Sequence, residues 1–133
     1  HIPGGEPVLV LCHYTPAPPP GGPDESPRHR MVDEGQLLDI LKLADRPLVY
    51  VHGHVHRPWL FQPKAAPNVL VLNAGSPTHL SHDDPLGQGF WTLDWSADQP
   101  LSRAIQRHVP LSETEWQSRS IHAPIAPGES AAI

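Results

Sequence analysis

Residues 47–58, Pro-Leu-Val-Tyr-Val-His-Gly-His-Val-His-Arg-Pro, form the stretch that decides the fold. The apolar run at 48–51 is β-branched and aromatic and follows a proline, which favours a short buried strand over a helix. Gly53 comes directly after His52, and we expect a sharp turn there because glycine adopts backbone conformations that a β-carbon forbids. The stretch is therefore predicted to be a strand that ends in a turn.

Three histidines, His52, His54 and His56, lie at the end of this predicted strand. Imidazole is the commonest metal ligand in proteins because it is largely uncharged near neutral pH. If the chain stays extended, His54 and His56 point to the same side, as side chains two apart in a strand do. The stretch therefore predicts part of a metal site, and the alternative is a cluster of solvated histidines.

Composition limits the classes of function. The chain has 133 residues, 38% of them apolar, which suits one domain with a modest core. No apolar run approaches the roughly 18 residues of a membrane span, and no secretory signal is evident. The single cysteine, Cys12, cannot form an internal disulfide, which agrees with the cytoplasmic location that we expect. The net charge of −5 and the lack of a Lys/Arg stripe argue against nucleic-acid binding.

A second buried strand is predicted at 8–12, where the chain is continuously apolar and should be covered on both faces. This strand leads into His13, so two predicted strands carry histidines at their C-terminal ends, where ligands gather in open α/β sheets. A helix is predicted at 33–45, with Asp33 and Gln36 at the spacing of a capping box. Its apolar stripe consists of Leu37, Leu38, Ile40, Leu41 and Ala44.

Three more strands are predicted at 68–73, 90–95 and 103–109, the last two joined by a hairpin turn at 96–100. Residues 57–67 are predicted to be a loop. The order is therefore β-α-β-β-β-β, and the strand–helix–strand unit favours a parallel pair. The later strands are expected to add antiparallel to that sheet or to form a second sheet.

The domain is predicted to cover residues 1–116. From Gln117 onward the chain lacks a pattern and contains Pro124, Pro127 and Gly128, so residues 117–133 are predicted to be a loosely ordered tail.

The polar ends of these strands form an ordered set: an isolated His13, then Gly53-His54-Val55-His56, then Asn73-Ala74-Gly75-Ser76. Each follows an apolar strand. The set resembles the C-terminal half of the calcineurin-like metallophosphoesterases, over about Val8 to Val109. Within that family it is most similar to the bacterial cyclic-nucleotide-phosphodiesterase-like members.

The resemblance implies an α/β fold that is the C-terminal half of a four-layer α/β/β/α sandwich. It also implies two divalent metal ions, manganese, iron or zinc, with His13 and His54 on one metal and His56 on the other. The implied reaction is hydrolysis of a small phosphoester, with a nucleotide among the candidates. A hydroxide held between the metals attacks phosphorus, and the cations offset the charge on the phosphoryl oxygens.

The chain departs from the family pattern in its first half. The motifs Asp-x-His, Gly-Asp-x-x-Asp and Gly-Asn-His-Asp or -Glu do not occur here and would lie before His1. Neutral imidazoles offset none of the charge of two divalent cations, and hard cations require oxygen ligands. We therefore expect the missing half of the domain to be supplied in cis or by another chain.

Five further residues have alternative interpretations, and no catalytic residue is identified in the chain. His52 either orients a metal ligand through its other ring nitrogen or points into the core. Tyr14, His79 and His82 either line the substrate entrance or are ordinary loop residues. Cys12 is predicted to be a small core residue, because a buried strand offers no group to stabilise a thiolate.

Three hypotheses remain. The first is the C-terminal portion of a metal-dependent phosphoesterase. The second is a non-catalytic metal-binding or interaction module that kept the strands without the chemistry. The third is a mononuclear zinc hydrolase built from His13, His54 and His56, since three imidazoles can hold one zinc with an open position.

Overall fold

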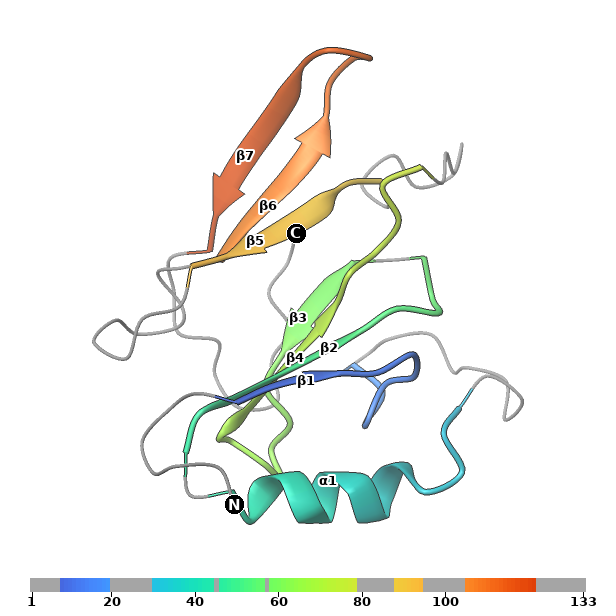
Figure 1. The fold of residues 1–133 in the computed structure, drawn as a ribbon, viewed down its shortest axis with the longest axis vertical. Coiled ribbons are helices and arrows are strands. Elements are labelled where there is room, and N and C mark those ends of the chain that lie inside the picture. The colour runs from blue at the N-terminus through green and yellow to red at the C-terminus, as the bar shows by residue number, and fades with distance from the viewer. Residues whose placement is uncertain are drawn as a thin grey trace.

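The structure is a computed structural model that describes residues 8–19, 30–44, 46–56, 58–78, 88–94 and 105–121. Within these ranges the fold is mixed α/β, with one short helix and two sheets (Figure 1). The elements are β1 (Val8–Leu11), α1 (Glu34–Lys42), β2 (Leu48–His52), β3 (Trp59–Phe61), β4 (Val69–Asn73), β5 (Phe90–Leu93), β6 (Ile105–Pro110) and β7 (Trp116–Ser120). None of the helical segments in these ranges has the length and apolar character needed to cross a bilayer.

The first sheet has four strands in the order β1-β2-β4-β3. β1, β2 and β4 are parallel, and β3 runs antiparallel beside β4. The parallel pairing of β1 with β2 confirms the prediction from the strand–helix–strand order. Leu11 pairs with Val51 and His52 pairs with Asn73, so the carboxyl ends of the three parallel strands lie at one edge of the sheet.

Each face of the four-stranded sheet packs against another layer (Figure 1). On one face, Leu41 of α1 is buried in a cluster with Tyr50 and Val71. On the other face, Ile105 of β6 is buried against Val49, Leu60, Leu70 and Leu72. β6 belongs to a second, antiparallel sheet in the order β5-β6-β7. The described layers are therefore α, β and β.

Two strands were not predicted. The interval 57–67, predicted to be a loop, contains β3, whose three residues are all buried. This run is too short to show a period, and its strand conformation depends on pairing with β4. The tail predicted from Gln117 is also wrong for 117–120, which form most of β7. β7 is almost entirely exposed and therefore shows no apolar alternation; residues 122–133 lie outside the described ranges.

The ends of α1 are held differently from the prediction. Asp33 is the N-cap residue but makes no capping hydrogen bond through its side chain, so the predicted capping box is wrong. Glu34 instead pairs with Arg30, one turn earlier. At the C-terminal end, Asn68 Nδ2 donates to the carbonyl oxygens of Leu41 (3.2 Å) and Ala44 (2.8 Å), which ties the end of the helix to the residue before β4.

Two predictions of burial were wrong. Ile40, placed on the apolar stripe of the helix, is 65% exposed. In β1, which was expected to be covered on both faces, Val8 and Val10 pack against the helix-side core, but Leu9 and Leu11 are 53% and 73% exposed. One side of the edge strand β1 is therefore apolar and uncovered.

Candidate metal site at the strand ends

The first two parallel strands bring His13 and His54 together. β1 and β2 are neighbours, and each histidine lies two residues beyond the end of its strand. His13 Nε2 lies 3.0 Å from His54 Nδ1, with ring centroids 4.8 Å apart. The backbone N–H of Gly53 donates to the His13 carbonyl (3.2 Å), which ties the two strand ends. The structure therefore brings His13 and His54, two of the predicted metal ligands, into contact.

Tyr14 completes a cluster of three rings. Its ring centroid lies 4.9 Å from that of His13 and 4.8 Å from that of His54. Its carbonyl oxygen accepts a hydrogen bond from the Tyr50 hydroxyl (2.9 Å), which anchors the loop after β1 to the core beneath it. Tyr14, which the sequence suggested at the substrate entrance or in an ordinary loop, is therefore in contact with both histidines.

The turn that carries His54 differs from the prediction. His54 itself has a positive φ of 68°, whereas Gly53 does not, and a Cβ at Gly53 would meet no atom within 4 Å. The Val55 N–H donates to the Gly53 carbonyl across His54 (2.8 Å). A positive φ spanned by such a bond marks a γ-turn of the rare, strained kind. The expectation of an extended chain at His54–His56 was therefore wrong.

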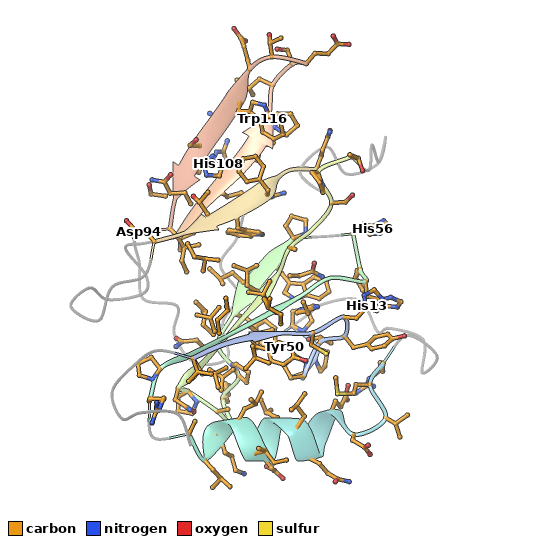
Figure 2. The ribbon with its side chains drawn as sticks, in the orientation of Figure 1. His13, Tyr50, His56, Asp94, His108 and Trp116 are labelled. Carbon is orange, nitrogen blue, oxygen red and sulfur yellow. The ribbon has the colours of Figure 1, made fainter. Side chains whose placement is uncertain are left out.

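His56 lies beyond this turn and is exposed. Figure 2 shows His13 and His56 at the same edge of the molecule but apart from each other. Among the described residues, no group of three or more His, Cys, Asp or Glu side chains is arranged to hold one metal ion. The other two histidine candidates, His79 and His82, fall outside the described ranges.

His52 is buried directly beneath the turn, with 2% of its surface exposed. Trp59 Nε1 donates to His52 Nε2 (3.1 Å), and His52 Nδ1 lies 3.1 Å from the Gly53 carbonyl oxygen. An indole N–H only donates, so Nε2 accepts and Nδ1 carries the proton. Burial lowers the pKa of His52 to about 4. The hydrogen bond to the Gly53 carbonyl acts in the other direction and raises this pKa, whereas the nearby His13 and His54 lower it further. His52 is therefore a neutral, buried imidazole that binds backbone.

Asn73, at the end of β4, was missed as a site residue. Its side chain is fully buried, and Nδ2 donates to the carbonyl oxygens of Gly53 (3.4 Å) and Val55 (2.9 Å). Its Oδ1 accepts from the Gly75 N–H (2.9 Å). A polar side chain closing an otherwise apolar strand was the available signal, because a buried amide requires hydrogen-bond partners.

Cys12 directly precedes His13, one of the three clustered rings, and is half-buried. A hydrogen bond with the Tyr50 hydroxyl lowers the pKa of the Cys12 thiol, against the opposing effect of burial. The sequence predicted no such group beside Cys12, and in the structure the Tyr50 hydroxyl donates its proton to the Tyr14 carbonyl. Burial in turn raises the pKa of Tyr50, so its hydroxyl stays protonated.

The donor atoms of His13 and His54 suit one divalent metal. Two nitrogens at the zinc distance of about 2.0–2.1 Å stand about 2.9 Å apart at a right angle and about 3.4 Å apart at the tetrahedral angle. The observed 3.0 Å falls within that interval. The same distance suits a hydrogen bond between neutral imidazoles, so metal entry would displace the shared proton.

A pocket of about 450 Å³ lies at the opposite edge of the sheet, beside the first residues of β2 and β4. Its lining comprises Arg46, Pro47, Leu48, Gln62, Pro67, Asn68 and Leu70. Asn68 is already engaged in capping α1, and ligands in α/β sheets bind at the carboxyl ends of the strands. The His13–His54 edge is the stronger candidate site.

Comparison of the chain with protein-family models, with curated proteins and with solved structures found no match. The functional assignment therefore rests on the contacts at the strand ends.

Proposed function

We propose that this chain supplies the histidine half of a metal-dependent phosphoester hydrolase. The observation that carries the proposal is the approach of His13 Nε2 to His54 Nδ1, 3.0 Å apart at the carboxyl ends of adjacent parallel strands. His13 and His54 would hold one divalent cation, manganese, iron or zinc. His56, on the far side of the turn, would serve the second.

When bound, the two cations would activate water and offset the charge that develops on the phosphoryl oxygens. The chain's own residues have simpler tasks. His13 and His54 bind through deprotonated ring nitrogens, so affinity depends on pH. Tyr14 packs against both rings and limits their rotation. Its exposed edge is a candidate contact for a small phosphoester, nucleotides included.

The remaining ligands and layer would come from a partner segment, in cis or from another chain. The uncovered side of β1, at Leu9 and Leu11, supports this part of the proposal. β5 also lies at the edge of its sheet, and β6 is the only strand paired with it in the described part of the chain. An added strand that paired with β5 would widen the second sheet over β1, and added helices on the outer face of that sheet would complete the four-layer α/β/β/α sandwich.

The rival function is a metal-binding module without catalysis. This module needs only the contact between His13 and His54 at the ends of β1 and β2. The mononuclear zinc hydrolase needs His56 to meet His13 and His54, and Figure 2 shows His56 apart from His13. The geometry therefore favours the first two functions over the third.

Metal binding is tested by calorimetric titration of Zn²⁺ and Mn²⁺ into the chain. We expect H13A and H54A to lose at least about tenfold in affinity, because each removes one of two donors. H108A is the matched control, since His108 lies on the second sheet, hydrogen-bonded to Thr92 and Ser118. Equal affinity of H54A and the unaltered chain would remove the basis of the proposal.

Catalysis is tested separately with bis(p-nitrophenyl) phosphate and manganese, using the chain together with the partner segment proposed above. Turnover that H54A and H56A abolish supports the phosphoesterase. Metal binding that H54A weakens, without turnover under any of these conditions, supports the non-catalytic module.

A further inference from the structure

We propose that His52 and Asn73 act as positioning residues: together they clamp the Gly53 carbonyl and so hold His54 in the strained turn that meets His13. The proposal extends to metal affinity only through the function proposed above. The clamp itself is a property of the described backbone and side chains.

The strained backbone conformation belongs to His54, which is not a glycine. His54 has a φ of 68°, a conformation that costs an L-residue free energy because the β-carbon crowds the backbone. Gly53, next to it, has an ordinary φ. A histidine in this conformation persists only where surrounding contacts determine it.

Those contacts converge on one oxygen. The Gly53 carbonyl accepts from the Val55 N–H (2.8 Å), from His52 Nδ1 (3.1 Å) and from Asn73 Nδ2 (3.4 Å). The first bond closes the turn around His54, and the other two come from side chains outside it. Asn73 Nδ2 also binds the Val55 carbonyl (2.9 Å), so both ends of the turn are held by one amide.

The two clamping side chains are themselves fixed. Trp59 Nε1 donates a hydrogen bond to His52 Nε2, so Nδ1 of His52 carries the proton and donates to the Gly53 carbonyl. Asn73 Oδ1 accepts from the Gly75 N–H, which sets the amide so that Nδ2 faces the turn. Their backbones pair in register between β2 and β4, and the Ala74 N–H donates to the His52 carbonyl (2.8 Å). The clamp is therefore built on the two central strands of the sheet.

Two variants of His52 separate positioning from packing. In H52N the side-chain amide nitrogen takes the place of Nδ1 and keeps the bond to Gly53. In H52Q the amide oxygen takes the place of Nε2 and keeps the bond from Trp59, but the donor to Gly53 is lost. Both disturb the buried site, so similar losses in urea midpoint are expected from the pair.

The first readout is hydrogen exchange of the Val55 amide, with the Ala74 amide as internal control. We expect H52Q to speed Val55 exchange at least about tenfold relative to Ala74, and H52N to restore it. N73D, which keeps the Oδ1 acceptor and loses the amide donors, should behave like H52Q. Unchanged Val55 exchange in both H52Q and N73D would overturn the clamp.

The second readout is cobalt affinity, followed by the visible absorption of the bound ion. H52Q should bind at least about tenfold more weakly than H52N, as expected when the support of a ligand is lost. If Val55 exchange responds but the unaltered chain binds no cobalt, the clamp stands and the proposed function fails. If cobalt binds equally to H52N and H52Q, the clamp does not position His54.

A comparison at position 54 tests the strain without altering the clamp. Glycine adopts positive φ freely, so H54G should unfold at a higher urea concentration than H54A. The reverse order would show that the turn is unstrained, and the proposal would lose its premise. G53A is the matched control, because a Cβ there meets nothing within 4 Å.

Discussion

The two sheets differ in how completely they are covered. Every residue of β3 and β4 is buried, whereas no residue of β5 or β7 is. The outer face of the second sheet carries a cluster of rings: Phe90 stacks on His108 at 4.6 Å and contacts Trp116 at 5.2 Å, and both Phe90 and Trp116 are more than 40% exposed. Figure 2 shows His108 and Trp116 on this sheet.

This difference indicates which part of the molecule buries its apolar side chains without a further layer. The four-stranded sheet has a helix on one face and a sheet on the other, so the side chains at its centre are buried without any additional segment. The second sheet and the outer side of β1 each present apolar groups without a layer above them in the described ranges. The candidate site follows the ends of β1 and β2, next to the uncovered side of β1, which suits a site completed by an additional segment.

The largest expected effect contrasts the centre with the edge of the four-stranded sheet. Leu72 is 1% exposed and Leu11 is 73% exposed. Replacing Leu72 by Ala should lower the free energy of unfolding by about 4 kcal/mol through lost burial and a cavity, and replacing Leu11 by less than about 0.5 kcal/mol. Urea unfolding followed by tryptophan fluorescence measures both. Equal losses would show that β1 is covered after all.

The next effect is a pH dependence that arises at the end of β2. Burial lowers the pKa of His52 from 6.5 to about 4, so between these values the unfolded chain binds a proton that the folded chain does not. The free energy of unfolding should therefore fall as pH is lowered through this window, by up to about 3 kcal/mol. Trp59, the Gly53 carbonyl, His13 and His54 surround the ring.

The measurement for this effect is urea unfolding of the chain and of H52Q between pH 7 and 4. The other histidines titrate in both proteins, so the difference between the two curves isolates His52. Parallel curves would indicate that His52 is not a buried neutral imidazole.

Gly89, at the start of the second sheet, should be less tolerant than the exposure of that sheet suggests. It has a φ of 131°, and a Cβ would clash with the His108 carbonyl and approach the Arg107 guanidinium (2.9 Å). G89A should lower the free energy of unfolding by about 2–3 kcal/mol. G35A is the control in α1, where a Cβ meets nothing and Ala should stabilise by about 0.5–1 kcal/mol. A tolerated G89A would mean that the second sheet adapts readily.

The smallest effect concerns the outer face of the second sheet. W116A should change the free energy of unfolding of this chain by only about 0.5 kcal/mol, because the ring is 45% exposed. In the presence of the partner segment proposed above, the loss should be several times larger if that segment covers this face. The same small loss in both cases would show that no further layer covers the outer face of the second sheet.

Local sequence predicted the elements with strong patterns. The apolar runs at 8–12, 48–52 and 68–73 are strands, and the helix lies within 33–45. The site prediction rested on the same logic: histidines that follow parallel strands meet, as His13 and His54 do. β3 and β7 were missed because a three-residue run and an exposed polar strand carry no period; their pairing partners determine them.

Side-chain types and their order along the chain were enough to predict that imidazoles gather at one edge of a parallel sheet, since local pattern locates the strands and the strand–helix–strand order makes the first two parallel. The path of the turn was not predictable in this way. Sequence placed the sharp turn at Gly53, but the positive φ falls on His54, where contacts from Trp59 through His52, and from Asn73, hold the turn. The physical reason is that backbone strain is tolerated where buried hydrogen bonds offset it, and those bonds join strands distant in sequence.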